Sequence, residues 1–167
     1  MNQPLKKVTI YTDGACLGNP GPGGYGAVLI YGSHRKELSG GYRLTTNNRM
    51  EIMAAIVALS ALKNRCRVDL YSDSQYVVNS INKSWVRRWQ ARNWMRTKDE
   101  KAKNPDLWEK LLELCARHEV SFHWIKGHNN HSENDLCDLL AVAAASTEGL
   151  PADEGYESDI LLQTSTS

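Results

Sequence analysis

Four acidic side chains occupy positions where a charge is unusual in a folded domain. Asp13 and Asp73 each end a run of alternating apolar residues, which is typical of a strand. Glu51 and Asp138 each lie beside apolar residues at helical spacing, and any one of the four could be a structural carboxylate. If all four converge on one cleft, their mutual repulsion favours bound divalent cations with oxygen ligands. We therefore expect Mg²⁺ or Mn²⁺ at this cluster.

The elements that position these acids follow from the periodicity of apolar residues. Alternation predicts strands over 8–13, 25–31, 36–44, 68–73 and 120–125. Helical spacing and capping residues predict helices over 48–62, 75–81, 105–115 and 133–145. The first three strands form an antiparallel meander, whereas strands joined through helices run parallel. The sequence thus predicts an α/β fold with a five-stranded mixed sheet flanked by helices, in which parallel strand ends bring Asp13 and Asp73 side by side.

Length and composition limit the classes of protein to which the chain can belong. The chain has 167 residues, of which 41% are hydrophobic and 23% charged, as expected for one globular domain. No apolar run approaches the length of a membrane span, and the N-terminus lacks the apolar core of a signal peptide. Four widely spaced cysteines without a CxxC pair indicate reduced thiols. We expect a cytoplasmic protein.

Charge is distributed unevenly along the chain. Residues 83–103 hold eight Lys or Arg against two acids, a net charge of +6. This basic segment could be a solvated helix face, but its tryptophans favour nucleic-acid binding. Residues 148–167 contain five acids and no Lys or Arg, which indicates a solvated acidic tail. We therefore predict a domain over 1–146 that contains the basic segment at about 83–103, and an acidic polar tail over 147–167.

Ordered sequence blocks resemble the type 1 ribonuclease H family, most closely its bacterial ribonuclease HI group. The resemblance rests on residues 12–24, 45–51, 72–76 and 124–128, followed by Glu133-Asn134 and Cys137-Asp138. It implies the ribonuclease H-like fold and endonucleolytic cleavage of the RNA strand of RNA/DNA hybrids, leaving 5′-phosphate and 3′-hydroxyl ends. It also implies that the four acids bind metal and that His128 is the histidine of a catalytic loop.

The implied chemistry fits these residue types. Phosphodiester hydrolysis can use two ions, bound together with substrate, that activate water and stabilise the leaving oxygen. On this model Asp13 and Asp138 hold the first ion, which generates the attacking hydroxide. Asp13, Glu51 and Asp73 hold the second ion, at the departing 3′ oxygen. His128 would move protons or ease product release, although a lone loop histidine is otherwise an ordinary surface residue.

Substrate contacts are also implied by the resemblance. Short amides that could sense the 2′-hydroxyls of the RNA strand are Asn19, Asn47, Asn48 and Gln75, and Thr46 matches a phosphate contact to the DNA strand. Without the resemblance, the asparagines are ordinary turn or helix-start residues. The family's basic protrusion grips DNA, and its matching residues here are Trp85, Arg87, Arg88, Trp89 and Arg92.

The tryptophans at positions 85 and 89 are four residues apart, so core packing is an alternative role for them. The segment also departs from the expected pattern. Arg88 replaces a neutral amide, and Asn93 and Asn130 replace glycines. Asparagine adopts left-handed backbone angles more readily than most residues, so neither loop need be broken.

Three functions compete at this point. The favoured one is a hybrid-specific endoribonuclease, whose partner is an RNA/DNA hybrid duplex. A DNA nuclease or strand-transfer enzyme on the same fold is disfavoured by the His128 loop and the basic segment. A catalytically silent hybrid-binding module is disfavoured because all four acids are present. No membrane and no obligate protein partner are implied, and we expect a monomer.

Overall fold

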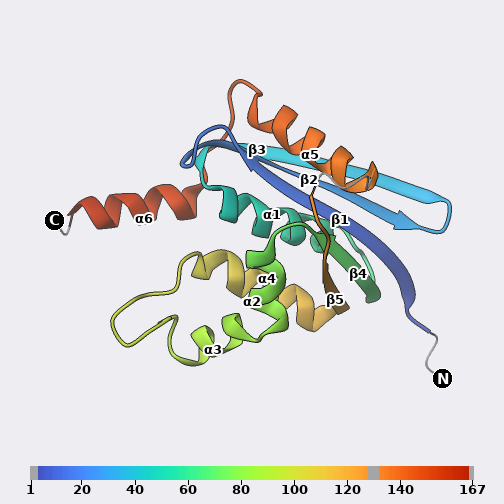
Figure 1. Ribbon diagram of the computed structural model, residues 1–167, viewed down its shortest axis with the longest axis horizontal. Coiled ribbons are helices and arrows are strands. Elements are labelled where there is room, and N and C mark those ends of the chain that lie inside the picture. The colour runs from blue at the N-terminus through green and yellow to red at the C-terminus, as the bar shows by residue number, and fades with distance from the viewer. Residues whose placement is uncertain (1–3, 128–131, 166–167) are drawn as a thin grey trace.

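A single mixed sheet organises the chain (Figure 1). The computed structural model describes residues 4–127 and 132–165. The strand order is β3-β2-β1-β4-β5, in which β1–β2 and β2–β3 pair antiparallel while β1–β4 and β4–β5 pair parallel. The strands are β1 (Lys6–Cys16), β2 (Gly21–Tyr31), β3 (His34–Thr45), β4 (Cys66–Ser72) and β5 (Glu119–Trp124). The predicted five-stranded mixed sheet is confirmed.

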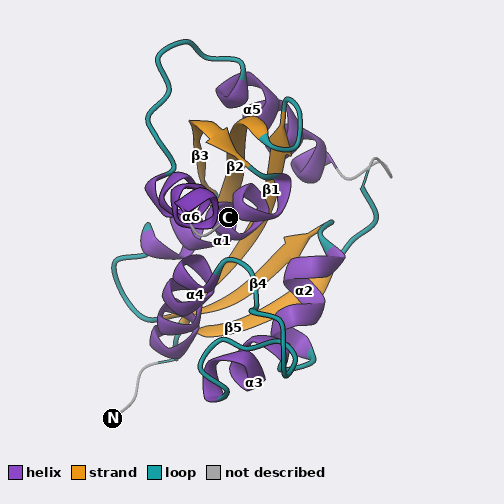
Figure 2. Ribbon diagram, turned by 90° about the vertical axis from the view of Figure 1, so that its left-hand side faces the viewer, coloured by secondary structure: helices purple, strands orange, loops and turns teal. Residues whose placement is uncertain are grey.

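Helices cover both faces of this sheet (Figure 2). α5 packs on one face against β1, β2 and β3, while α1 packs on the other face and is covered in turn by α4. The helices are α1 (Asn47–Ser60), α2 (Gln75–Asn82), α3 (Trp85–Ala91), α4 (Pro105–Arg117), α5 (Ser132–Ala145) and α6 (Glu154–Ser165). All four cysteines are free thiols, as expected. Among the helices of the described residues, none has the length and apolar character needed to cross a membrane.

α1 is the central helix of the core. Ile52 and Leu59 from α1 pack with Ile10, Val68 and Leu70 from the sheet, and all five side chains are fully buried. Because the sheet covers one side of α1 and α4 another, the helix is buried around most of its circumference. Thr46 begins it, accepting a hydrogen bond from the backbone N–H of Arg49 at 3.3 Å. Core packing therefore fixes both the position and the rotation of α1.

The segment after α5 packs against the domain, so the prediction of a solvated acidic tail is wrong for this part of the chain. Asp153 is only 4% exposed and accepts hydrogen bonds from the Arg49 guanidinium at 2.7 and 2.9 Å and from the Thr45 hydroxyl at 2.6 Å. Just beyond it, Glu157 accepts two hydrogen bonds from Arg43. Thr45 and Arg49, which bury Asp153, lie more than 100 residues away, which local charge patterns cannot reveal.

Arg49 joins three elements through its guanidinium. Besides Asp153 it binds Asp106, in the first turn of α4, through two hydrogen bonds of 2.9 and 2.8 Å. Burial by itself would raise the pKa of Asp106, but the hydrogen bonds and charge of Arg49 hold it below its usual value. Burial would lower the pKa of Arg49, and its two carboxylate partners more than reverse this effect. Arg49 therefore remains charged although its side chain is 4% exposed.

We expect Asp153→Asn to destabilise the protein by about 3 kcal/mol. Removing one partner of a buried pair leaves an undercompensated charge, which costs about 3–5 kcal/mol, and Asp106 still neutralises part of it. Urea unfolding in the presence of a chelator measures the change. Glu157→Gln is the matched control, because its partner Arg43 is 62% exposed and the effect should be much smaller. Equal losses in the two variants would contradict a specific role for the buried pair.

Candidate active site

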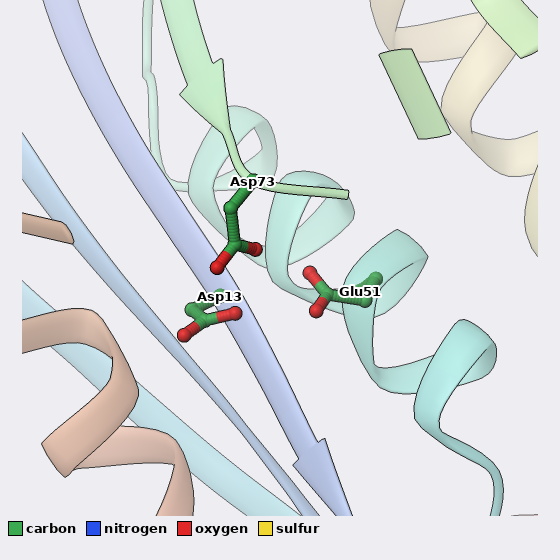
Figure 3. A group of neighbouring side chains, drawn as sticks. All are labelled: Asp13, Glu51 and Asp73. Atoms are coloured by element: carbon green, nitrogen blue, oxygen red, sulfur yellow. The ribbon is translucent and has the colours of Figure 1, made fainter. Parts of the chain in front are cut away.

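Three of the predicted acids converge at one end of the parallel strands (Figure 3). Asp13 comes from β1, Glu51 from α1 just after its first turn, and Asp73 directly follows the last residue of β4. Each offers one carboxylate oxygen, and these oxygens lie within 4.8 Å of one another. Asp13 and Glu51 are 4% and 5% exposed. The predicted convergence is confirmed for these three residues.

Gly14 sets the distance between the first two acids. A Cβ atom at this position would lie 2.5 Å from the backbone nitrogen of Glu51 and 2.6 Å from the carbonyl carbon of Met50. The backbones of β1 and α1 are thus in direct contact, with no space for a side chain between them. Asp13 precedes Gly14 in sequence and Glu51 is itself part of the contact, so their carboxylates are brought together.

The third acid is positioned by the parallel pairing of β1 with β4. Thr12 pairs with Ser72, so the residues that follow them, Asp13 and Asp73, lie at the same level. Asp73 is just past the end of β4, whereas Asp13 is still paired with Gly26, because β1 continues to Cys16 beyond the predicted end at Asp13. The backbone N–H of Ser74 bonds the Ser72 hydroxyl at 3.0 Å, and the Ser74 side chain caps α2. Asp73 therefore lies in a tight turn between β4 and α2.

Burial and mutual repulsion raise the pKa values of Asp13 and Glu51. Burial raises the pKa of Asp13 to about 8, and the charges of Asp73 and Asp138 contribute to the rise. Burial likewise raises the pKa of Glu51 well above its usual value, with further contributions from Asp13 and Asp73. The backbone N–H of Gly14 donates to Asp13 at 2.9 Å and partly opposes the effect. Without cations, the cluster must retain protons near neutral pH.

The fourth predicted acid lies near the cluster but outside it. Asp138 is half-buried on α5, and its charge contributes to the raised pKa of Asp13. It does not belong to the group of oxygens within 4.8 Å. Its neighbour Cys137 is fully buried and donates its thiol to the backbone carbonyl of Tyr11 at 3.3 Å. Cys137 therefore anchors α5 against β1, with Asp138 beside the cleft.

The donor set of the cluster fits a hard divalent cation. All three clustered acids are carboxylates, and carboxylate oxygens are the ligands that Mg²⁺ and Mn²⁺ prefer. One oxygen of Glu51, Oε2, is buried without a hydrogen-bond partner in the structure. A buried polar atom without a partner is costly, and a cation would satisfy it. The residues present thus fit the predicted metal.

Two of the predicted sugar contacts lie together beside the cluster. The side-chain oxygen of Asn19 accepts a hydrogen bond from the backbone N–H of Asn47 at 3.1 Å, which joins the turn after β1 to the start of α1. Asn48 is exposed one residue further along α1. Gln75 is exposed at the first position of α2. The hydroxyl of Thr46 already accepts the hydrogen bond that caps α1. These polar groups therefore flank Glu51 and Asp73.

The basic segment combines a packed side with a charged side. Trp89 packs against the core, as one of the alternatives for the tryptophans predicted, whereas Trp85 is half-buried and lies under the Lys83 ammonium, 5.4 Å from its ring centroid. Asn93 adopts a left-handed backbone with φ of +55°, as its replacement of glycine anticipated. The three arginines are exposed, and no ion pair holds them within the described part of the chain: Arg87, Arg88 and Arg92.

Some predicted positions lie outside the described residues. His128, Asn130 and His131 belong to this group, so the assignment of the loop histidine stays a prediction.

Sequence reasoning did not single out Gly14 or Arg49. A charged residue at a buried position of an otherwise apolar helix was the available signal for Arg49.

Comparisons with known proteins identify the family. The family model described as RNase H matches residues 5–146. The chain belongs to the RNase H family. It is 67% identical over 153 residues to a protein named Ribonuclease H from Syntrophus aciditrophicus, covering 92% of this chain and 88% of that protein.

Solved structures agree with this family assignment. LC9-RNase H1, described as a type 1 RNase H with the type 2 active-site motif, superposes with a TM-score of 0.77 at 32% identity, covering 95% of this chain and 82% of that one. LC11-RNase H1, solved in complex with an RNA/DNA hybrid, shares the fold with a TM-score of 0.64 at 24% identity, covering 83% and 96%. The match ends before α6, so the buried Asp153 lies outside the part that the family model covers.

We expect the metal-free protein to lose stability as pH rises from about 4 to about 8. The native state holds a proton on Asp13 up to about pH 8, whereas the unfolded chain releases it near the ordinary aspartate pKa of 3.8. The native state therefore binds more protons within this window, and its stability falls with increasing pH.

Asp13→Asn should remove much of this dependence and stabilise the metal-free protein at pH 8. One unit of pKa shift corresponds to about 1.4 kcal/mol, so the melting temperature should rise by at least about 2–4 °C. Thermal melts in a chelator at pH 5 and pH 8 measure both effects. A variant that melts below the wild type at pH 8 would contradict the electrostatic cost assigned to the cluster.

Proposed function

We propose that this chain is an endoribonuclease that hydrolyses the RNA strand of RNA/DNA hybrids and leaves 5′-phosphate and 3′-hydroxyl ends. The observation that carries the proposal is the convergence of the Asp13, Glu51 and Asp73 carboxylates, of which the first two are buried and the third is half-buried. Membership of the RNase H family supports it, and the same fold holds a hybrid in LC11-RNase H1. The residues flanking the cluster supply polar and cationic contacts suited to a duplex.

The carboxylates are the proposed ligands of the metal. Asp13, Glu51 and Asp73 would hold Mg²⁺, or Mn²⁺ as a substitute, and Asp138 would complete a two-ion site with substrate. When bound, such ions supply water activation and neutralise charge at the phosphorus and the leaving oxygen. The rigid backbone contact at Gly14 keeps two of the ligands in place before substrate arrives.

Substrate selection is assigned to groups around this cluster. Asn19 and Asn47 are already joined by a hydrogen bond, so they present a preformed polar surface to the sugars of the RNA strand. Asn48 and Gln75 extend this surface, and Thr46 is the proposed phosphate contact to the DNA strand. The exposed arginines of α3 and its C-terminal end bind further phosphates without reading sequence, beside Trp85 and Trp89.

His128 is the proposed proton-transfer group, because an imidazole with an ordinary pKa near 6.5 gains and loses protons near neutral pH. We further propose that the chain acts as a cytoplasmic monomer. The free thiols are consistent with a reducing compartment.

The decisive experiment compares cleavage of labelled RNA/DNA hybrid, double-stranded DNA and double-stranded RNA, each with and without Mg²⁺. We expect cleavage of hybrid RNA only, and only with the cation. Asp73→Asn should reduce hybrid cleavage to background, since it removes a charged ligand. The control is Asp69→Asn, in the strand that precedes Asp73, because Asp69 is 45% exposed and pairs with His123 away from the cluster. Cleavage of DNA, or normal turnover in Asp73→Asn, would overturn the proposal.

Replacing Arg87, Arg88 and Arg92 together with alanine should weaken hybrid binding and reduce its dependence on salt. Each lost phosphate contact should lower the slope of log affinity against log salt by roughly 0.9, the value for B-DNA. Saturated turnover should change little, since the carboxylates are untouched.

The charge-matched control for this variant removes Lys6, Lys7 and Lys36, which lie at the opposite ends of their strands from the acids. Fluorescence anisotropy of a labelled hybrid at several salt concentrations measures both slopes. If both triple variants lower the slope equally, the basic segment contributes only overall charge.

A further inference from the structure

Asp73 lies beyond the end of its strand, so the ladder of β4 does not itself fix its carboxylate. Three contacts reach this residue and its neighbour from the end of β5 and the residues that follow. They involve Trp124, Ile125 and Gly127. These residues belong to the sequence block 124–128, in which only His128 was given a role. We infer that Trp124 and Gly127 are positioning residues that hold Asp73 as a metal ligand; the inference rests on the proposed function.

The first contact is a hydrogen bond from a side chain. The indole Nε1–H of Trp124 donates to the backbone carbonyl of Asp73 at 3.0 Å. The indole is otherwise poorly buried, since Trp124 is 46% exposed and does not belong to the core cluster. Core packing therefore does not account for its position. A donor bonded to the backbone of Asp73 fixes the direction in which its side chain leaves the chain.

The second contact extends the parallel ladder by one residue. Ser72 pairs with Trp124 in the register of β4 and β5, and the N–H of Ile125 donates to the Ser72 carbonyl at 3.0 Å. The two hydrogen bonds thus hold two successive carbonyls, those of Ser72 and Asp73, and their donors are the successive residues Ile125 and Trp124 at the end of β5. The turn that carries Asp73 cannot move away from β5 without breaking both.

The third contact is the packing of Gly127 against the carboxylate itself. A Cβ atom at Gly127 would lie 2.7 Å from Oδ2 of Asp73 and 3.5 Å from its Cβ and Cγ. The φ of Gly127 lies outside the left-handed region, so an alanine would not strain the backbone. Its methyl group would instead push the carboxylate from its place. The absence of a side chain at 127 is what leaves room for the observed position of Asp73.

These contacts act on a ligand whose partners are already fixed. Asp13 and Glu51 are held by the backbone contact at Gly14, so Asp73 must be held separately for the three oxygens to remain within reach of one cation. Groups that orient a metal ligand typically contribute about 10–100-fold to metal affinity. Trp124 and Gly127 therefore contribute to cation affinity without touching the cation.

Calorimetric titration of the full chain with Mn²⁺, without nucleic acid, tests this role. We expect Trp124→Phe, which keeps an aromatic ring but removes the N–H, to weaken Mn²⁺ binding by roughly 10-fold. Gly127→Ala should weaken it at least as much. The melting temperature in a chelator should change little in either variant, because neither site contributes to the core. Tyr31→Phe is the control, an aromatic residue of similar exposure (42%) at the other end of the sheet, and it should bind as the wild type does.

The reference variant Asp73→Asn distinguishes failure of the positioning role from failure of the metal site itself. If it loses Mn²⁺ binding while Trp124→Phe and Gly127→Ala retain wild-type affinity, the positioning role is wrong and the metal site stands. If affinity falls in Trp124→Phe only in step with a large loss of melting temperature, the indole is a structural group and the inference is overturned. If the wild type binds no Mn²⁺, or Asp73→Asn binds it equally well, the proposed metal site itself fails.

Discussion

The direct contact between the backbone of Gly14 and that of Met50 and Glu51 is the constraint on which the site depends. It brings a strand and a helix closer than any side chain would permit, and so presses two carboxylates into one buried space. Raising the pKa of Asp13 from 3.8 to about 8 has a free-energy cost of several kcal/mol. Each large apolar side chain buried in the core contributes about 1.5–3 kcal/mol, so a few contacts of α1 with the sheet offset that cost.

The first turn of α1 is also held from its outer side. Arg49 precedes Glu51 by two residues, and its guanidinium bonds Asp153 and Asp106 while Glu51 faces Asp13. One helical turn thus carries an acid toward the cleft and a cation toward two other acids. Each charge has its own set of partners, and the two networks reinforce the rotation that core packing gives the helix. The C-terminal segment therefore contributes to the geometry of the site although it lies outside the match to the family model.

The parts of this arrangement that could be predicted from sequence are those that depend on local pattern. Alternation and helical spacing predicted the strands and most helices, and the rule that parallel strand ends meet predicted that Asp13 and Asp73 lie together. The contact of Gly14 with α1 could not be predicted, because a glycine at the end of an alternating strand pattern has many explanations. The burial of Asp153 was missed because its partner Arg49 is 104 residues distant. A segment rich in acids resembles a solvated tail unless the buried cation that binds it is known.

The site and the basic segment carry opposite charges, and each responds differently to the phosphates of a polyanion. Phosphates approach the exposed arginines favourably, whereas a phosphate at Asp13, Glu51 and Asp73 meets carboxylates that already repel one another. The acids must therefore be neutralised before a phosphate can enter, either by protons or by cations. Because the pKa of Asp13 is raised to about 8, protons still occupy the cluster at neutral pH. Protons and divalent cations thus compete for the same oxygens, so metal affinity, and with it any activity that requires the metal, should increase as pH rises through this range.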